Sequence, residues 1–301
     1  MLPDAPLHRL DLDWLRESGV DVAILRLDLI DPLISGNKWF KLKHHLRAAN
    51  DAGAEGVISL GGAHSNHLHA LAAAGKRFGF ATVGLLRGHP VETPTVLDLH
   101  AFGMALHWLG YAGYRARHEA DFWLPWRQRY PQLHPIPEGG GGMDGASGCA
   151  DIVAQARRQL GHIGWDDYDG WWLACGTGTT LAGLVLAEAQ GRKAYGAMAV
   201  PEGHGVAQNI QQILGSSTDR AYELLDASRG GFARTDPELL VFIAESELQS
   251  GIPFEPLYTG KALLALRQAV EAGRLAHGSK LIFVHTGGLQ GKRGFTGESR
   301  R

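Results

Sequence analysis

Short apolar runs alternate with longer amphipathic segments along most of the chain. The runs with strand character cover residues 22–29, 56–60, 81–86, 105–109, 171–176, 194–200 and 280–288. Between most of them lie segments in which apolar residues recur at helical spacing, such as 37–53 and 65–79. This alternation predicts an α/β fold with parallel or mostly parallel open sheets covered by helices.

Three of the predicted strands run directly into glycine-rich loops. Their sequences read SLGGAHSN at 59–66, LACGTGTT at 173–180 and FVHTGG at 283–288. In open α/β sheets ligands bind beyond the carboxyl ends of the strands, so we expect the three loops to share one crevice. A further glycine-rich segment, PEGGGGMDGASG at 137–148, fits either a hinge where the chain crosses between domains or a plain surface loop.

Composition narrows the class of protein without identifying it. The 301 residues are 45% apolar and 20% charged, and the formal net charge is −2. This balance offers no basic excess for binding nucleic acid or an acidic membrane surface. The two cysteines, Cys149 and Cys175, are too few for a disulfide framework, and their spacing fits no zinc motif. Without a recognisable signal peptide or membrane-spanning run, we expect a cytoplasmic protein.

The loop Gly176–Thr180 has the features of an anion site. A predicted strand enters it and a predicted helix leaves it, so the N–H groups of the first helical turn point towards a ligand placed there. Gly176 and Gly178 let the backbone approach that ligand. The hydroxyl donors in the loop are Thr177, Thr179 and Thr180. The sequence matches neither a P-loop nor GxGxxG. A phosphate group is the expected guest, and a tight strand–helix turn without a ligand is the alternative.

Lys38 stands at the start of the predicted helix, in the stretch SGNKWF. Lysines inside a helix usually face solvent, which is the first expectation for Lys41 and Lys43. At the first turn, by contrast, the helix dipole and burial against Trp39 and Phe40 would disfavour the charged form of Lys38. A lysine with a lowered pKa is a nucleophile for carbonyl groups and the usual anchor for an aldehyde cofactor. Lys38 is therefore a candidate for covalent chemistry.

The loop before the second predicted helix contains Ser65, a good N-cap residue, followed by Asn66. The backbone N–H groups of such a turn suit a carboxylate. His64, His67 and His69 suggest a metal site as an alternative, but two of them lie near the cap and His69 would project from a different face than His67. We therefore expect no metal here and favour histidines that serve the helix start or an active site.

Taken together, these motifs resemble a known family. The stretches SGNKWFKL, GGAHSNHLHALAAA, CGTGTTLAGL, FEPLYTGKAL and VHTGG occur in the order found in fold-type II pyridoxal-phosphate enzymes. The chain is most similar to the 1-aminocyclopropane-1-carboxylate deaminase/D-cysteine desulfhydrase family, over roughly residues 22–290. The resemblance implies a tryptophan synthase β-like fold, pyridoxal 5′-phosphate as cofactor, a small amino-acid substrate and, by analogy, a homodimer.

The resemblance also implies roles for single residues. The implied catalytic residues are Lys38, Ser65 and Tyr258. Lys38 would hold the cofactor covalently and move the proton at the substrate carbon, while Tyr258 would lie against the cofactor ring. The substrate would contact Ser65, Asn66, His67 and Tyr258, and Asn66 would also bond the phenolic oxygen of the cofactor. The phosphate would be held by Gly176, Thr177, Gly178, Thr179 and Thr180, with charge added by Lys41. Thr259 or Thr286 would face the pyridine nitrogen.

The residue that follows Tyr258 affects which reaction we expect. Deaminases of this family carry Glu there, whereas this chain carries Thr259. A carboxylate keeps the pyridine nitrogen protonated and makes the ring a stronger electron sink than a hydroxyl does. The stretch SNH, in place of SNQ, also matches the desulfhydrases. We expect α,β-elimination from a D-cysteine-like amino acid, which releases a 2-oxo acid, ammonia and a leaving group such as sulfide. Deaminase activity on 1-aminocyclopropane-1-carboxylate is the alternative.

The chain is expected to form two domains with the cofactor in the cleft between them. Residues 1–49 plus 139–301 would form a large cofactor-binding domain, and 50–138 a small inserted one. Two other classes of protein stay open. A non-catalytic nucleotide- or anion-binding α/β protein would use the threonine loop and leave Lys38 at the surface. A metal hydrolase would use His64, His67 and His285.

Overall fold

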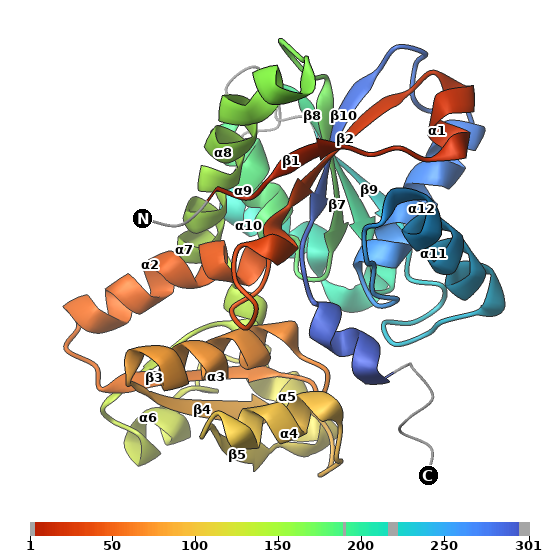
Figure 1. Ribbon diagram of the computed structural model, residues 1–301. Helices are drawn as coiled ribbons and strands as arrows, with labels where there is room; N and C mark the ends of the chain where they lie inside the picture. Colours follow the sequence, from red (N-terminus) through yellow and green to blue (C-terminus); the bar gives the residue numbers. More distant parts are fainter. Residues whose placement is uncertain (1–3, 189–190, 216–221, 295–301) are drawn as a thin grey trace.

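The computed structural model describes residues 4–188, 191–215 and 222–294. Its strands form one six-stranded and one four-stranded sheet, which lie in separate lobes (Figure 1). Neighbouring strands run parallel in both sheets, except for one antiparallel pair at the edge of the larger sheet. The predicted α/β fold with mostly parallel open sheets is confirmed.

The larger sheet has the order β1-β2-β10-β7-β8-β9. Its strands are β1 (Leu7–Arg9), β2 (Asp21–Arg26), β7 (Gly170–Cys175), β8 (Lys193–Met198), β9 (Tyr222–Asp226) and β10 (Lys280–His285). The inner strands are buried on both faces and therefore read as continuous apolar runs, which the sequence revealed. The edge strands β1 and β9 are shorter and less buried, and the hydrophobic pattern did not predict them.

The smaller sheet has the order β5-β4-β3-β6, with all neighbours parallel. Its strands are β3 (Gly56–Gly61), β4 (Ala81–Leu86), β5 (Ala105–Trp108) and β6 (Leu133–Pro135). One face is covered by α2 (Asn37–Asp51), α3 (Asn66–Phe78) and α4 (Pro94–Ala101). The other is covered by the region of α5 (Gly110–Arg115) and α6 (Leu124–Arg129).

Helices also cover both faces of the larger sheet, as Figure 1 shows. One face packs against α7 (Gly142–Cys149), α8 (Asp151–Gln159), α9 (Thr179–Ala187) and α10 (Val206–Leu214). The other packs against α1 (Asp13–Ser18), α11 (Pro237–Ser250) and α12 (Thr259–Glu271). Because side chains alternate along a strand, Ile282 of β10 enters the first core and Phe283 enters the second.

The glycine-rich segment 137–148 is mostly a helix and not a surface loop. After a short turn it forms α7, whose small residues let neighbouring elements approach closely. A Cβ atom on Gly148 would lie 2.1 Å from the carbonyl oxygen of Phe40 in α2, and one on Gly183 of α9 would lie 2.4 Å from that of Ala146. The segment thus leads from the smaller sheet to the helices of the larger one and holds α2 and α9 together.

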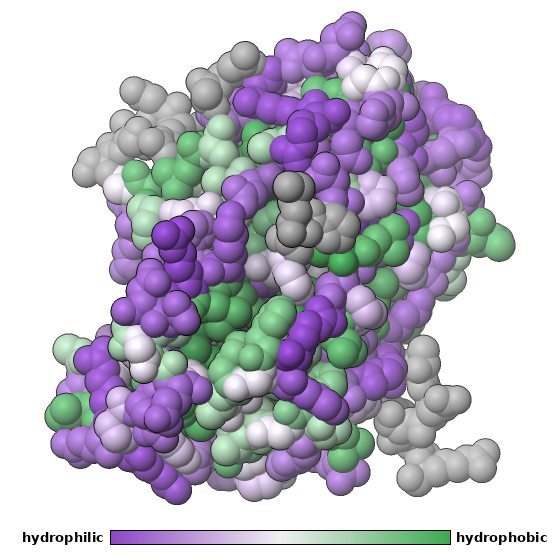
Figure 2. Space-filling view, turned by 60° about the vertical axis from the view of Figure 1, so that its left-hand side comes forward, coloured by the Kyte–Doolittle hydropathy of each residue, from purple (hydrophilic) through white to green (hydrophobic). Residues whose placement is uncertain are grey.

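All four strands of the smaller sheet fall within residues 50–138, and the six strands of the larger sheet fall outside that range. The division of the chain into two domains, 1–49 plus 139–301 and 50–138, stays a prediction. In the space-filling view, the molecule narrows between the two lobes (Figure 2). Within the described ranges, no helix is long and apolar enough to cross a membrane.

The start of α2 is fixed by Gly36, which precedes the helix. Gly36 has φ 71° and ψ −150°, a backbone conformation open almost only to glycine. The N–H of Asn37 then donates to the carbonyl of Thr286, at 3.2 Å. A Cβ atom on Gly36 would lie 1.9 Å from that same carbonyl oxygen. The glycine therefore sets the contact between the beginning of α2 and the loop after β10.

We predict that Gly36→Ala lowers the free energy of unfolding by roughly 3 kcal/mol, from backbone strain and the clash with Thr286 together. Gly53→Ala is the matched control, because Gly53 has φ 67° but no atom within 4 Å of an added Cβ. It should lose only about 1 kcal/mol. Urea unfolding of both variants measures the difference, and equal losses would show that the contact at Gly36 is not tight.

Candidate active site

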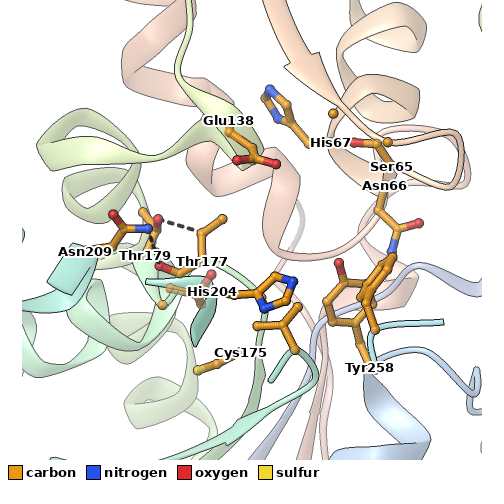
Figure 3. Close-up of a pocket in the computed structure, with 18 of the residues that line it drawn as sticks. Ser65, Asn66, His67, Glu138, Cys175, Thr177, Thr179, His204, Asn209 and Tyr258 are labelled. Atoms are coloured by element: carbon orange, nitrogen blue, oxygen red, sulfur yellow. Dashed lines mark hydrogen bonds between the residues drawn. The ribbon is translucent and has the colours of Figure 1, made fainter. Parts of the chain in front are cut away.

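A cavity of about 200 Å³ opens between the carboxyl ends of the strands in the two sheets. Most of the residues predicted for the site line it, and they come from segments far apart in sequence. Those residues are Lys38, Lys41, Ser65, Asn66, His67, Gly176, Thr177, Gly178, Thr179, Thr180, Tyr258 and Thr286. One side of the cavity carries Thr177, Thr179 and Asn209, and the other carries Ser65, Asn66 and Tyr258 (Figure 3).

The first turns of α2 bring three polar side chains into this cavity. The amine of Lys38 donates to the side-chain oxygen of Asn37 at 2.8 Å, and the amide of Asn37 donates to the hydroxyl of Thr180 at 2.8 Å. Lys41, one turn later, is buried and donates to the carbonyl of Gly139 at 3.0 Å and to the hydroxyl of Thr177 at 3.3 Å. Asn37 therefore links Lys38 to the threonine loop.

Burial and charge repulsion set the protonation of these two lysines. Burial and, to a lesser extent, the nearby charge of Lys41 together lower the pKa of Lys38 to about 7. Burial also lowers the pKa of Lys41. Lys41 does not face solvent as first expected, whereas Lys43 does, paired with Asp151 at 2.5 Å. Lys38 thus holds a large fraction of free amine near neutral pH, the form that attacks a carbonyl carbon.

The loop after β7 forms a cradle of hydrogen-bond donors. Gly178, with φ 76°, precedes α9, so the first N–H groups of the helix face the cavity at Thr179 and Thr180. The hydroxyls of Thr177 and Thr179 lie 3.0 Å apart, and Thr177 also meets the amine of Lys41. Free helical N–H groups, hydroxyls and an adjacent cation are together the complement of a phosphate.

The start of α3 faces the cavity from the smaller lobe. The hydroxyl of Ser65 caps this helix by accepting from the N–H of Leu68 at 3.2 Å. The side-chain oxygen of Asn66 accepts from Gln290 at 2.8 Å. His67 is buried, and its Nε2 lies 2.8 Å from the hydroxyl of Ser59. Its Nδ1 is buried without a protein partner within the described residues, so it is an unsatisfied polar atom at the cavity wall.

The histidines do not form a metal site in the part of the chain that the structure describes. No group of three or more His, Cys, Asp or Glu side chains there is arranged to hold a metal ion. His69 turns away to Asp98, at 3.1 Å. His285 is buried 3.2 Å from Asp28 and also contacts the carbonyl of Pro253. Burial lowers the pKa of His67 well below its usual value, which keeps this ring neutral.

Tyr258 lines the cavity just before α12, and its neighbour Thr259 does not. The hydroxyl of Thr259 lies 3.1 Å from the buried carboxylate of Glu255, which also accepts from the N–H groups of Tyr258 and Thr259. Of the two threonines considered for the ring nitrogen, the structure places only Thr286 at the cavity. Burial raises the pKa of Tyr258, with help from the charges of Glu255 and Glu138, so its hydroxyl stays protonated.

Several lining residues were not predicted. Asn37 immediately precedes Lys38, and its amide in that motif was the signal that could have revealed it. Glu138 pairs with Arg117 at 2.6 Å and accepts from the hydroxyl of Tyr114 at 2.5 Å. Tyr114 and Arg117 lie three residues apart, Glu138 lies more than 20 residues further along the chain, and no motif links them. The remaining unpredicted lining residues include Arg87, His118, Cys175, Val200, His204, Asn209 and Phe232.

We predict that Lys38 in the protein freed of cofactor titrates with a pKa of about 7, far below the usual 10.5. Lys41→Met should raise that pKa, because it removes the neighbouring positive charge. The measurement is the pH dependence of acetylation at Lys38, followed by mass spectrometry of the digested protein. Lys43→Met, which removes an exposed charge, is the control and should leave the curve in place. A Lys38 that titrates as an ordinary surface lysine would contradict the prediction.

Comparison with known proteins agrees with this geometry. The chain matches the family described as pyridoxal-phosphate dependent enzyme over residues 3–287. It is 31% identical to a putative 1-aminocyclopropane-1-carboxylate deaminase of Pyrococcus horikoshii, over 92% of this chain and 87% of that protein. It is 26% identical to the mitochondrial bifunctional D-cysteine desulfhydrase/1-aminocyclopropane-1-carboxylate deaminase of Arabidopsis thaliana, over 95% of this chain and 76% of that protein.

A solved structure shares the whole fold. The crystal structure of a homologue of 1-aminocyclopropane-1-carboxylate deaminase superposes with a TM-score of 0.81 at 28% identity, and the match covers 96% of this chain and 91% of that one. The tryptophan synthase β-like architecture is thereby confirmed, and with it pyridoxal 5′-phosphate as the cofactor. The chain belongs to the pyridoxal-phosphate dependent enzymes of fold type II, among the homologues of 1-aminocyclopropane-1-carboxylate deaminase and D-cysteine desulfhydrase.

Proposed function

We propose that this enzyme catalyses α,β-elimination from a small D-cysteine-like amino acid and releases a 2-oxo acid, ammonia and a leaving group such as sulfide. The observation that carries the proposal is the meeting of three features in one cavity. These are a lysine amine with a lowered pKa, a cradle of anion donors and the capped N-terminus of α3. The lysine amine would bind the aldehyde of the cofactor, the anion donors its phosphate, and the N-terminus of α3 the substrate carboxylate.

The residues present fit pyridoxal 5′-phosphate. The phosphate would rest on Gly176–Thr180, where Lys41 supplies the positive charge and the hydroxyls of Thr177 and Thr179 supply donors. A Cβ atom on Gly176 would come within 3.1 Å of the ring of Tyr258, so the glycine keeps space open beside the tyrosine. When bound, the cofactor supplies an electron-withdrawing ring that stabilises negative charge at the α carbon of an amino acid.

Lys38 and Tyr258 would take different parts in proton transfer, because the pKa of Lys38 is lowered and that of Tyr258 is raised. The lowered pKa of Lys38 lets its Nζ accept a proton from the substrate carbon and return it. The raised pKa of Tyr258 keeps its hydroxyl a donor, suited to hydrogen-bonding a leaving group or a ring oxygen. Asn37 would orient Lys38, because it accepts from Nζ while it is anchored on Thr180.

The substrate carboxylate would bind at the start of α3. Ser65, Asn66 and His67 occupy the first turn there, where backbone N–H groups and the helix dipole favour an anion. Asn66, held by Gln290, would also reach the phenolic oxygen of the cofactor. Ser65 would then bind substrate more than cofactor.

Elimination is favoured over ring-opening deamination by the residues near the ring nitrogen. Thr286 is the threonine that reaches the cavity, and a hydroxyl makes the ring a milder electron sink than a carboxylate would. The buried Glu255 is engaged by backbone N–H groups of residues 257–259 and does not line the cavity. Deaminase activity on 1-aminocyclopropane-1-carboxylate is the second candidate, since the names of both relatives cited above include that activity.

The experiment that tests the proposed function measures 2-oxo acid and ammonia from a panel of D- and L-amino acids with β-leaving groups, alongside 1-aminocyclopropane-1-carboxylate. We predict turnover of D-cysteine with release of sulfide, and none by Lys38→Ala, which should fold but release its cofactor on gel filtration. Lys43→Met is the control and should keep both cofactor and turnover. Turnover confined to 1-aminocyclopropane-1-carboxylate would select the second candidate, and no turnover of any substrate would contradict both.

We predict that Ser65→Ala raises KM about tenfold or more while it leaves cofactor retention nearly unchanged. The substitution also removes a helix cap, which costs about 1 kcal/mol of stability. Thr93→Ala is the control for stability, because Thr93 caps α4 without lining the cavity, and its hydroxyl also donates to the carbonyl of Ala63 at 2.6 Å. It should lose at least as much stability as Ser65→Ala and keep an ordinary KM. A Ser65→Ala enzyme that loses cofactor but keeps its KM would place Ser65 at the cofactor instead.

A further inference from the structure

Lys261 is a fully buried lysine of α12, outside the cavity described above, with 1% of its surface exposed. Its amine donates three hydrogen bonds to backbone carbonyls, of Ser228 at 2.9 Å, Gly231 at 2.9 Å and Phe232 at 3.0 Å. Within the described residues it makes no ion pair with a carboxylate. A buried ammonium is thus coordinated by one short loop alone.

Such an arrangement has the chemistry of a cation site. Backbone carbonyls that converge on one point replace the hydration shell of a monovalent cation, as in the filters of ion channels. The same carbonyls, if buried without a donor, would each lose a hydrogen bond. The ammonium of Lys261 satisfies three of them at once. The loop 228–232 therefore depends on a positive charge that is supplied covalently by the neighbouring helix.

The loop is held in a conformation that needs support. Arg229 has φ 57°, and it is the non-glycine residue with a positive φ in the described part of the chain. Gly230 follows with φ 78°. Outside the loop, Arg229 pairs with Asp236 and Glu238, each at 2.6 Å. Residues in the left-handed region persist only where surrounding contacts fix them. The ion pairs fix the loop from outside, and Lys261 fixes it from inside.

The last residue of this loop reaches the candidate active site. Phe232 lines the cavity, and its ring packs edge-on against the ring of Tyr258, with centroids 5.3 Å apart and planes at 62°. The carbonyl of Phe232 is one of the three that Lys261 holds. The backbone of Tyr258 is fixed separately, by the carboxylate of Glu255. The amine of Lys261 is therefore two contacts away from the tyrosine ring.

We propose that Lys261 is a positioning residue, a tethered monovalent cation that orders the loop 228–232 and so holds Phe232 against Tyr258. Removal of the side chain should leave a carbonyl-lined site that takes a small free cation such as ammonium or potassium. A surface hollow lined by Asp226, Arg229, Asp236 and Lys261 adjoins this site, so a small cation could enter from there. The kinetic part of this proposal rests on the proposed function, whereas the ordering of the loop does not.

The test compares Lys261→Ala and Lys261→Met in the holoenzyme. In Lys261→Ala, amide exchange at 228–232 should rise and kcat should fall about tenfold, with a smaller effect on KM. Ammonium or potassium chloride should restore both, and choline chloride at equal ionic strength should not. Met fills the space without charge, so Lys261→Met should show the same losses without restoration. Lys43→Met, an exposed lysine variant, should behave as the wild type.

The outcomes decide the proposal even if the enzyme has another substrate. Amide exchange and thermal unfolding report the order of the loop independently of any activity, so a failed activity assay would bear on the proposed function alone. Wild-type amide protection at 228–232 in either variant, measured without added ammonium or potassium, would overturn the proposal. So would losses that choline restores as well as potassium does. If Lys261→Ala does not fold under any salt, protection of this loop in Lys261→Met decides the matter.

Discussion

Lys38 and Lys41 lie one turn apart on α2 and share a buried cavity. The electrostatic repulsion between their positive charges is the constraint on which the site depends. Burying one ammonium costs several kcal/mol unless it is paired, and two of them raise the cost. The structure relieves part of it by directing Lys41 to the carbonyl of Gly139 and the hydroxyl of Thr177. The other part is relieved when Lys38 gives up its proton, which makes it a nucleophile. A phosphate dianion near Lys41 would complete the balance.

The fold supplies the close approaches that this arrangement needs. The carboxyl ends of both sheets face one cavity, so loops from distant parts of the sequence can meet there. Glycines allow the contacts at two critical places: Gly36 lets α2 begin against Thr286, and Gly148 lets α7 pack on α2. Through these contacts the first turn of α2 is placed beside the threonine loop. The chemistry of Lys38 is thus a consequence of backbone packing at least as much as of its own side chain.

The sequence predicted the inner strands and the helices that follow them, and most of the residues it predicted for the site line the cavity. Those features produce local patterns: apolar runs, N-cap residues and glycine-rich loops after strands. The edge strands β1, β6 and β9 were missed because they are short and partly exposed, and such strands lack a continuous buried run. The segment 137–148 was ambiguous, because glycines that allow helix packing look the same as glycines of a loop. The group of Tyr114, Arg117 and Glu138 could not be predicted, since the contacts that join Glu138 to the other two are tertiary.

Thr259 and Lys261 show the same limit within one motif. In sequence both lie within three residues of Tyr258. In the structure Thr259 turns to Glu255, and Lys261 turns to a loop more than 25 residues earlier in the chain. Helical periodicity separates the faces of α12, but it does not say which face meets the cavity when the helix is buried on most sides. Only packing decides that question.

The most direct measurement of the central claim is a crystal structure of the enzyme loaded with pyridoxal 5′-phosphate. We predict continuous density from the amine of Lys38 to the cofactor, with the phosphate resting on residues 176–180 beside Lys41. Density that joins the cofactor to another lysine, or a phosphate bound away from that turn, would contradict the account.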